Sequence, residues 1–357
     1  MEILIVKLSA IGDVVHTLPC LESLRAAYPE SRITWLIEED AYEIIKGHPC
    51  LDHVLVSRRK TWIKNIFKPS RSIQTIHEIG SFIRELKRTE YDIVVDFQGL
   101  FKSGILARIS GSKRRVGYDK TRELSYLFLN ERIFPYNPDS HAVQRYIHLA
   151  RYAGGEAIEP RFFIPIQENN IECVKGFLKE NNIKEGDKII AINPCSGWDT
   201  KLWEWERFSI LSDRITDILD AKIVLTGSED DRALIDAISN KMQNPVCNTA
   251  GRMSLKDLAY LLSLVDIMVT TDTGPMHIAS AVETPTIALF GPTAPCRTGP
   301  YGNNHTIIKS DIECSPCFKK RCNTKKCMKE ITVDRVLSAV SEKLNPSEKR
   351  AVKSLSV

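Results

Sequence analysis

The sequence has no long hydrophobic run. No apolar stretch approaches the roughly 18 residues of a membrane-spanning helix, so any membrane association is expected to be peripheral. It also has little excess of either charge, because 49 Lys and Arg against 45 Asp and Glu leave a formal net charge of +4. With 43% hydrophobic and 26% charged residues, the composition excludes a disordered chain and a strongly basic nucleic-acid-binding protein.

Three ligand-binding motifs are also missing. There is no Gly-x-Gly-x-x-Gly and no Gly-x-x-x-x-Gly-Lys-Ser/Thr, which disfavours an NAD-dependent oxidoreductase and a P-loop kinase or ATPase. There is no Asp-x-Asp to hold a divalent metal on a sugar nucleotide. Any bound phosphates are therefore expected to be neutralised by helix N-termini and lysine, with no metal in the active site and no cofactor.

The amino terminus, Met-Glu-Ile-Leu-Ile-Val-Lys, has an apolar run too short for an export signal, so we expect a cytoplasmic protein. Its ten cysteines are then expected to be free thiols or metal ligands. Four of them, Cys314, Cys317, Cys322 and Cys327, are separated by two, four and four residues. This spacing is compatible with an all-cysteine zinc knuckle, but a cysteine-rich segment that binds no metal is the favoured interpretation.

Short β-branched runs alternate with segments of helical periodicity, which is typical of parallel sheets covered by helices. Strands are expected at residues 3–6, 33–37, 91–96, 188–193, 222–226, 266–270 and 286–290. The segment 159–167 carries two prolines and no helical period, which makes it the best candidate for a linker. We therefore predict an α/β protein with domains at 1–163 and 164–345, and a flexible tail at 346–357.

Ligands of open α/β sheets lie beyond the carboxyl ends of the strands, so the loops after the predicted strands are the ones to examine. After the first strand, Asp13 either caps a helix or serves as a general base. In the second half, Ser196, Gly197 and Lys201 follow a strand and offer a hydroxyl, a backbone N–H and a charge to an anion. Glu229 follows another strand, where its carboxylate would suit a sugar hydroxyl, with a solvated acid at a helix start as the equal alternative.

The most informative segment is 271–279, which follows a buried strand and opens a helix. Thr273 and Gly274 would place a hydroxyl and backbone N–H groups at the positive end of that helix, where phosphate is stabilised. A proline directly after them suits the first helical turn. The alternative is a well-capped helix with His277 in the core.

Together these loops resemble glycosyltransferase family 9, the lipopolysaccharide heptosyltransferases with the two-domain GT-B fold. The resemblance extends to about residue 340. It rests on Lys-Leu-Ser-Ala-Ile-Gly-Asp-Val-Val-His-Thr-Leu-Pro (7–19), Asp-Thr-Gly-Pro-Met-His (272–277) and Ala-Leu-Phe-Gly-Pro-Thr (288–293). Asp-Phe-Gln-Gly-Leu-Phe-Lys-Ser (96–103) and His-Ala-Val (141–143) are more similar to heptosyltransferase I than to heptosyltransferase II.

The resemblance implies two Rossmann-like domains whose parallel sheets face each other across a cleft, the first binding the acceptor and the second the ADP-sugar. Asp13 matches the catalytic base and Lys201 the lysine at the diphosphate and donor sugar. Residues that match or flank the donor site are Ser196, Gly197, Glu229 at the ribose, Met253 at the adenine, Asp272, Thr273, Gly274 and His277.

The near-neutral total charge conceals a basic segment. Residues 57–77 contain Arg58, Arg59, Lys60, Lys64, Lys68 and Arg71, no acid, and interleaved apolar residues. Such a segment suits an anionic lipid or a phosphorylated acceptor, although a solvated helix face has the same composition. The predicted acceptor-binding residues are Arg58, Arg59, Lys64, Gln98, Lys102 and Arg122.

The resemblance implies inverting, metal-independent transfer of heptose from ADP-heptose to Kdo2-lipid A or inner-core lipopolysaccharide at the inner membrane. Nucleic acid is not an expected partner. The alternatives are a family member that adds a later heptose or another nucleotide sugar, and a non-catalytic protein that binds a nucleotide sugar or lipid A. An NAD oxidoreductase is disfavoured by the missing glycine motif.

Overall fold

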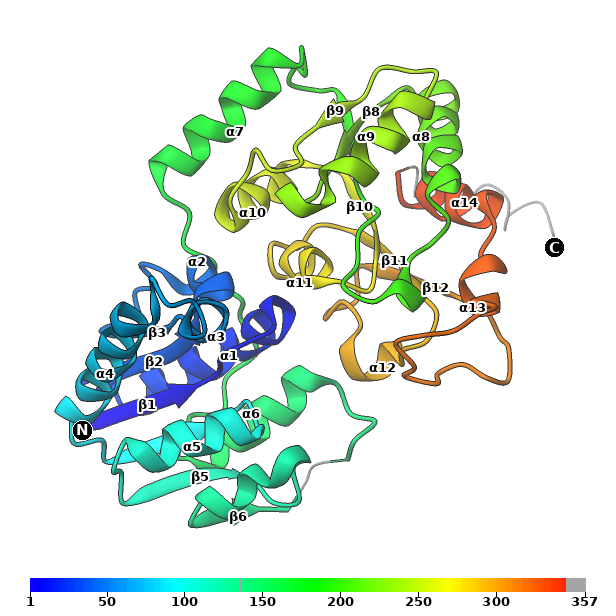
Figure 1. Ribbon diagram of the computed structural model, residues 1–357. Helices are drawn as coiled ribbons and strands as arrows, with labels where there is room; N and C mark the ends of the chain where they lie inside the picture. Colours follow the sequence, from blue (N-terminus) through cyan, green and yellow to red (C-terminus); the bar gives the residue numbers. More distant parts are fainter. Residues whose placement is uncertain (135–136, 345–357) are drawn as a thin grey trace. The chain divides into compact units, whose positions relative to one another are not determined.

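The computed structural model describes residues 1–134 and 137–344, and the predicted tail at 346–357 lies outside these ranges. Figure 1 shows two groups of strands and helices, and the chain divides into two compact units, Met1–Pro165 and Ile166–Val357. Residues 155–167 contain no helix or strand. The predicted domain boundary at 163/164 stays a prediction.

Unit 1 contains a six-stranded parallel sheet with the order β3-β2-β1-β4-β5-β6. Its strands are β1 (Glu2–Val6), β2 (Arg32–Glu38), β3 (His53–Ser57), β4 (Ile93–Asp96), β5 (Arg114–Tyr118) and β6 (Glu131–Ile133). The last four residues of β1 are fully buried. Near-continuous apolar runs of this kind are typical of parallel strands that are covered on both faces.

Helices cover both faces of this sheet. The helices are α1 (Ile11–Ala27), α2 (Tyr42–Ile45), α3 (Arg59–Ile66), α4 (Ser72–Arg88), α5 (Phe101–Ile109) and α6 (Ala142–Tyr152). Side chains of α3, α4 and α5, among them Trp62, Phe82 and Ala107, form one core with Leu4 and Val94 of the sheet. Helix α1 packs against α6 and α2.

Unit 2 repeats the arrangement with the strand order β12-β11-β10-β7-β8-β9. Its strands are β7 (Lys188–Asn193), β8 (Ala221–Leu225), β9 (Cys247–Asn248), β10 (Ile267–Thr271), β11 (Thr286–Phe290) and β12 (His305–Lys309). Counted from the first strand of each unit, the order is the same in both sheets. All of these pairings are parallel.

The helices of unit 2 also lie on both faces of its sheet. They are α7 (Glu168–Glu180), α8 (Trp205–Leu219), α9 (Arg232–Lys241), α10 (Leu255–Leu264), α11 (Gly274–Ala281), α12 (Pro295–Thr298), α13 (Lys326–Lys329) and α14 (Val333–Leu344). Helices α8, α9 and α14 share the larger core with the strands. On the other face, Met276 of α11 packs against Ala288 and Phe290 of β11. No helix within the described ranges is both long enough and apolar enough to cross a bilayer.

The strand order places a switch point in each unit. Strand β1 lies between β2 and β4, and β7 lies between β8 and β10, so successive connections run in opposite directions from these strands. Crevices for ligands form at this point, beyond the carboxyl ends of the strands. The predicted doubly wound α/β architecture is confirmed, and the predicted strands at 188–193 and 286–290 coincide with β7 and β11.

Candidate active site

In unit 1, a hydrogen-bonded group lies around Asp13 in the first turn of α1, just beyond β1. Its Oδ1 accepts a 3.0 Å hydrogen bond from the Tyr146 hydroxyl, and the Lys7 Nζ lies 3.9 Å from the same oxygen. Its Oδ2 has no hydrogen-bond partner among the described residues, and the side chain is 37% exposed. One carboxylate oxygen is therefore fixed while the other remains open to a substrate.

Lys7 and Tyr146 form the buried side of this group. The Lys7 Nζ donates to the Tyr146 hydroxyl at 2.8 Å and to the Phe97 carbonyl at 3.0 Å. Burial lowers the pKa of Lys7, although the charges of Asp13 and Asp96 oppose this effect. Burial, reinforced by the Asp13 charge, raises the pKa of Tyr146 well above its usual value. Tyr146 therefore stays a neutral donor to Asp13 near neutral pH.

The loop after β4 holds the loop after β1. The predicted acceptor residue Gln98 accepts hydrogen bonds from the backbone N–H groups of Leu8 and Ser9, both at 2.9 Å. Asp96 accepts from the backbone of Gln98 and Gly99 and from the Ser103 hydroxyl. Burial nevertheless raises the pKa of Asp96 to about 6. The side-chain amide oxygen of Gln98 thus holds the loop after β1 in place, and acceptor binding by this residue stays a prediction.

Glu38, at the end of β2, was not among the predicted site residues. Its Oε1 accepts hydrogen bonds from Lys102 at 2.8 Å and Arg59 at 2.9 Å, and its side chain is 2% exposed. Burial alone would raise the pKa of Glu38, but the hydrogen bonds and charges of Lys102 and Arg59 together lower it. Lys102 also donates to the Ser9 hydroxyl at 3.1 Å. The sequence signal that could have identified Glu38 is its position as an acid at the end of a buried strand.

The basic segment divides into two parts. Arg58 pairs with Glu39 at 3.3 Å and with Glu78 at 3.5 Å, and Lys60 pairs with Asp40. In contrast, no ion pair within the described part of the chain involves the exposed residues Lys64, Lys68 and Arg71. Arg122 begins a 3₁₀ turn, Arg122–Phe128, and its side chain lies outside the described residues.

In unit 2, the loops after β7, β10 and β11 meet at Asp272. The Lys201 Nζ lies 2.7 Å from Asp272 Oδ2, and the Thr293 hydroxyl donates to the same oxygen at 2.6 Å. Both members of the ion pair are largely buried, with 15% of the Lys201 side chain and 6% of that of Asp272 exposed. The structure thus brings together two predicted donor-site residues. Thr293 was not predicted as a site residue, although it ends one of the matching motifs.

The start of α11 lies in the same set of loops. Thr273 is its N-cap residue and Pro275 occupies its first turn, while the Thr273 hydroxyl makes no cap hydrogen bond. Ser196 donates to the Asp272 carbonyl at 3.4 Å, which links the loops after β7 and β10. Gly274 opens α11 and is half-buried, and Gly197 is exposed. His277 lies deeper in α11 and is buried.

The predicted nucleoside contacts come from loops after the neighbouring strands β8 and β9. Glu229 is exposed and pairs with Arg232 at 2.7 Å. Its carboxylate lies against Gly251, where a Cβ atom would stand 1.9 Å from Glu229 Oε2 and where φ is +69°. The positive φ favours glycine at this position, whereas the exposed end of Glu229 could move away from a Cβ atom. Met253 is half-buried, two residues before α10.

The cysteine-rich segment runs from the loop after β12 into α13, where Cys327 is buried, and its four cysteines are free thiols. Within the described ranges, the one set of potential metal ligands that lies within 4.8 Å is Glu22, His48 and Cys50, so the four thiols are not gathered as in a zinc knuckle. The His48 Nδ1 accepts the Cys50 backbone N–H at 3.2 Å, which places the ring proton on Nε2, facing Glu22. Metal binding at Nε2 would need the other tautomer.

Cys322 is expected to be the most acidic of the exposed thiols. Hydrogen bonds from the backbone of Lys325 and from Thr324 lower its pKa to about 7. Because the thiolate is the nucleophile, iodoacetamide should alkylate Cys322 with a rate that is half-maximal near this pH. Peptide mass spectrometry against time and pH measures the reaction. The control is Cys173, which is also exposed but has a raised pKa; equal rates at pH 7 would contradict the expectation.

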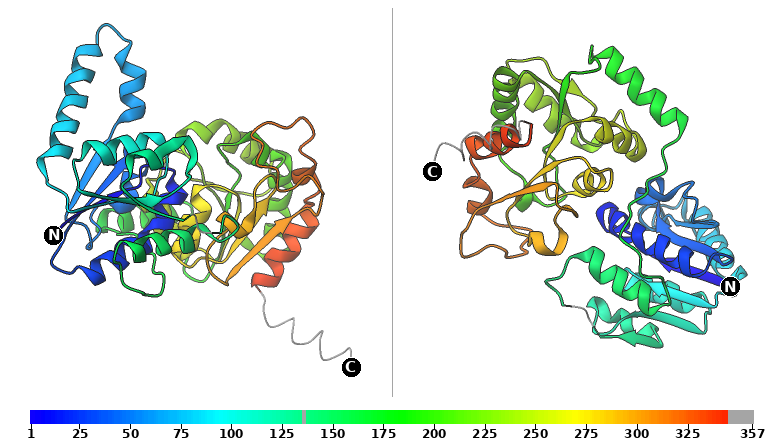
Figure 2. Two further views of the ribbon diagram at one scale, coloured as in Figure 1. Left: turned by 90° about the horizontal axis from the view of Figure 1, so that it is seen from below. Right: turned by 180° about the vertical axis from the view of Figure 1, so that it is seen from behind.

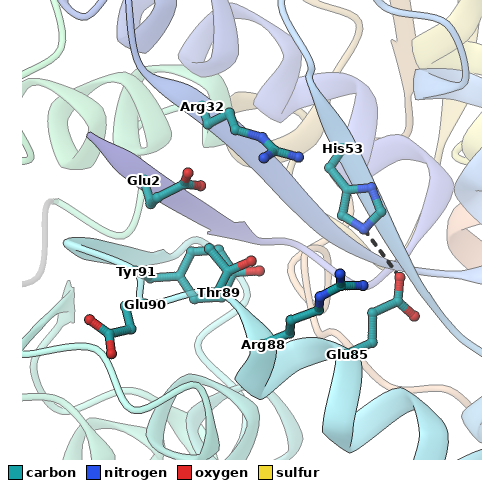
Figure 3. A pocket seen from close by; sticks show the side chains of 8 residues that line it. All are labelled: Glu2, Arg32, His53, Glu85, Arg88, Thr89, Glu90 and Tyr91. Atoms are coloured by element: carbon teal, nitrogen blue, oxygen red, sulfur yellow. Dashed lines mark hydrogen bonds and ion pairs between the residues drawn. The ribbon is translucent and has the colours of Figure 1, made fainter.

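A pocket of about 540 Å³ opens at the amino ends of the unit 1 strands, at the end of the sheet away from Asp13 (Figure 3). It lies near the amino ends of β1, β2 and β3, where Glu2, Arg32 and His53 line it, and His53 contacts Glu85 at 3.2 Å. Since ligands of doubly wound sheets lie beyond the carboxyl ends of the strands, this pocket is not the candidate active site.

Comparisons with known proteins identify the family. The model of glycosyltransferase family 9 (heptosyltransferase) matches residues 79–328. Lipopolysaccharide heptosyltransferase 1 of Pseudomonas aeruginosa is 31% identical over 324 residues, which cover 90% of this chain and 87% of that protein. The E. coli heptosyltransferase WaaC with ADP-2-deoxy-2-fluoro heptose is similar with a TM-score of 0.73 at 25% identity, covering 96% of this chain and 99% of that one.

A family 9 glycosyl transferase from Veillonella parvula has a TM-score of 0.82 at 24% identity, covering 97% of this chain and 98% of that one, which supports the fold. The family match includes the loops that carry Gln98, Lys201 and Asp272. The predicted family, GT-B fold and enzyme class are confirmed. On this evidence the chain belongs to glycosyltransferase family 9 and is a glycosyltransferase.

Proposed function

We propose that this enzyme transfers heptose from ADP-heptose to the Kdo or inner-core region of lipopolysaccharide, with inversion and without a metal. The observation that carries the proposal is Asp13, whose carboxylate has one oxygen fixed by Tyr146 and one open, at the carboxyl edge of the unit 1 sheet. The relatives named lipopolysaccharide heptosyltransferase 1, and the WaaC structure with an ADP-heptose analogue, support the choice of substrates.

In the proposed reaction, Asp13 is the general base. The open oxygen of Asp13 takes the proton from an acceptor hydroxyl while the oxygen of this hydroxyl attacks the anomeric carbon of the heptose. The bond from the anomeric carbon to the diphosphate breaks on the opposite face, and its electron pair leaves with ADP. A single displacement of this kind inverts the configuration. Tyr146 and Lys7 act as positioning residues, because they hold the other oxygen of Asp13.

Unit 2 is the proposed donor site. Lys201 and the start of α11 at Thr273 and Gly274 stabilise the charge that develops on the leaving diphosphate. Asp272 holds Lys201 in place and faces the sugar. Donor contacts are also assigned to Ser196, Gly197, Glu229, Met253 and His277, with Glu229 on the ribose hydroxyls and Met253 on the adenine.

Lys64 and Arg59 are proposed to bind the anionic acceptor. Neutralising both, as Arg59→Gln with Lys64→Gln, should raise the acceptor KM about tenfold while the donor KM changes less than twofold. Lys64 has no ion pair among the described residues, whereas the Arg59 Nε is held by Glu38. Steady-state kinetics with each substrate varied in turn tests this. Lys179→Gln, at an exposed lysine of α7, is the matched control, and equal effects on both substrates would refute the assignment.

The proposed acceptor implies a cellular location for the enzyme. A lipid-anchored acceptor would be reached by a peripheral protein at the cytoplasmic surface of the inner membrane, and we include this location in the proposal. Nucleic acid is not a proposed partner.

The proposal is tested by incubating the enzyme with Kdo2-lipid A and either ADP-heptose or other nucleotide sugars, with product identification by mass. Transfer of one heptose from ADP-heptose, at a rate unchanged by EDTA, is the expected result. Transfer only to an acceptor that already carries heptose would favour addition of a later heptose. Donor binding without transfer would favour a non-catalytic protein, and transfer only from another donor would refute the central assignment.

A further inference from the structure

Helices α3 and α4 form a hairpin that packs on the sheet of unit 1 through Trp62 and Phe82, while its turn end projects away from the sheet (Figure 2, left). Large apolar side chains are exposed close to the turn between them, at residues 67–71. They are Ile63, Phe67, Ile73 and Ile76, with exposed fractions of 54%, 87%, 71% and 58%. Phe67 has the largest exposed fraction of any large hydrophobic residue in the described ranges. Single exposed apolar residues are ordinary, but several at one end of a hairpin mark an interaction surface.

Other residues hold the hairpin together. The rings of Trp62 and Phe82 pack with their centroids 5.3 Å apart, and Trp62 Nε1 donates to Glu78 at 3.0 Å. Both rings belong to the core of unit 1. The apolar side chains near the turn, by contrast, are largely exposed to solvent in the fold. Polar substitutions at Phe67 and Ile73 should therefore leave the fold intact.

The same end of the hairpin is positively charged. Lys68 and Arg71 lie in the turn, both are exposed, and neither forms an ion pair with a described residue. No acidic residue occurs between Arg58 and His77. Near the sheet, in contrast, Arg58 and Lys60 are paired with acids. The cations that remain available are therefore those beside the exposed apolar residues.

We propose that this tip, Phe67, Ile73 and Ile76 with Lys68 and Arg71, inserts into the surface of a bilayer that contains anionic phospholipid. Apolar side chains enter the boundary between head groups and acyl chains, while cations bind the anionic head groups. Association with a second copy of the same tip is disfavoured, since it would bring like charges together. The inference deepens the proposed membrane location and rests on it, but it names the surface and the lipid.

The test measures binding to vesicles of phosphatidylethanolamine and phosphatidylglycerol by co-sedimentation, without lipopolysaccharide and at about 0.15 M salt. The decisive variant is Phe67→Lys, which adds a positive charge but removes the apolar side chain. Binding should weaken about tenfold, because the apolar contribution of one phenylalanine is lost. Phe67→Ser with Ile73→Ser should weaken it further, and Lys68→Gln with Arg71→Gln should reduce the preference for anionic over phosphatidylcholine vesicles. Ile218→Ser, at an α8 residue that is 60% exposed, is the apolar control and should bind as the wild type does.

Three results would overturn the inference. Tighter binding by Phe67→Lys would mean that attraction is purely electrostatic. Wild-type binding only to vesicles that contain lipid A would assign the tip to the acyl chains of the acceptor. A change of oligomeric state in Phe67→Ser with Ile73→Ser would assign it to a second copy. Because the vesicles carry no acceptor, the binding result can be interpreted even if the enzyme does not transfer heptose.

Discussion

The Asp13→Asn variant is expected to lose about a thousandfold in kcat while it binds the donor as tightly as the wild-type enzyme. The amide is nearly the same size as the carboxylate, and its oxygen still accepts the 3.0 Å hydrogen bond from Tyr146. It lacks the basic oxygen that would take the proton of the acceptor. Because the donor residues belong to unit 2, the dissociation constant for ADP-heptose, measured by calorimetry, should be unchanged. Single-turnover transfer measures the loss of rate.

The Tyr146→Phe variant tests how much the orientation of the Asp13 carboxylate contributes to the rate, because the carboxylate itself is retained. This variant removes the hydroxyl that donates to Asp13 and accepts from Lys7, but it leaves the carboxylate in place. A fall in kcat of about tenfold, with unchanged KM for either substrate, is the expected result, since only the orientation of the base is lost. Thermal unfolding of both variants checks that the buried Lys7 has not destabilised the fold.

Two outcomes would remove Asp13 as the base. The N-cap of α1 is Ala10 and no side chain makes a cap hydrogen bond, so a capping role for Asp13 is not borne out. Asp13→Asn with near wild-type transfer would leave Asp13 as a first-turn acid that complements the helix dipole. Asp13→Asn with weaker donor binding and an unchanged kcat would make it a donor contact.

Much of the fold followed from the sequence because the buried parallel strands are uninterrupted apolar runs. Strands β7 and β11 were predicted to the residue, and β1, β2, β4, β8 and β10 to within two residues at each end. Strands β3, β5, β6, β9 and β12 were not predicted from the sequence. Some of these carry exposed charges, as in Arg114 of β5, or contain only two residues, as in β9. Partly exposed strands at a sheet edge, or next to it as β5 is, have too weak a pattern to be recognised without their neighbours.

The candidate site was only partly predictable for a different reason. Asp13, Lys201 and Asp272 stand after strands in recognisable motifs. Tyr146 comes from α6 and contacts Asp13 across 133 residues of sequence, and Thr293 reaches Asp272 across 21. Such partners depend on how helices pack on the sheet, and no local pattern encodes them. The basic segment was read as one surface, yet half of its cations are held by acids from elsewhere in unit 1.

The second large effect is expected for Lys201→Met, which should weaken ADP-heptose binding about a hundredfold and lower the free energy of unfolding by about 3 kcal/mol. The substitution removes a cation from the proposed diphosphate site. It also leaves Asp272, of which 6% is exposed, as a buried carboxylate without its ionic partner. The donor phosphates would then meet an uncompensated negative charge, so the loss exceeds that of one favourable contact. Calorimetric titration and urea unfolding measure the two effects.

The double variant Lys201→Met with Asp272→Asn distinguishes these contributions. If the unpaired charge of Asp272 causes part of the loss, neutralising it should restore about tenfold in donor affinity and part of the stability. Thr293 can still donate to the remaining amide oxygen of residue 272, so the loop after β11 should keep its place. Equal donor affinities for the single and double variants would mean that Asp272 exerts no repulsion on the donor. Wild-type affinity in Lys201→Met would remove Lys201 from the diphosphate site, and the start of α11 would then be the main source of phosphate stabilisation in unit 2.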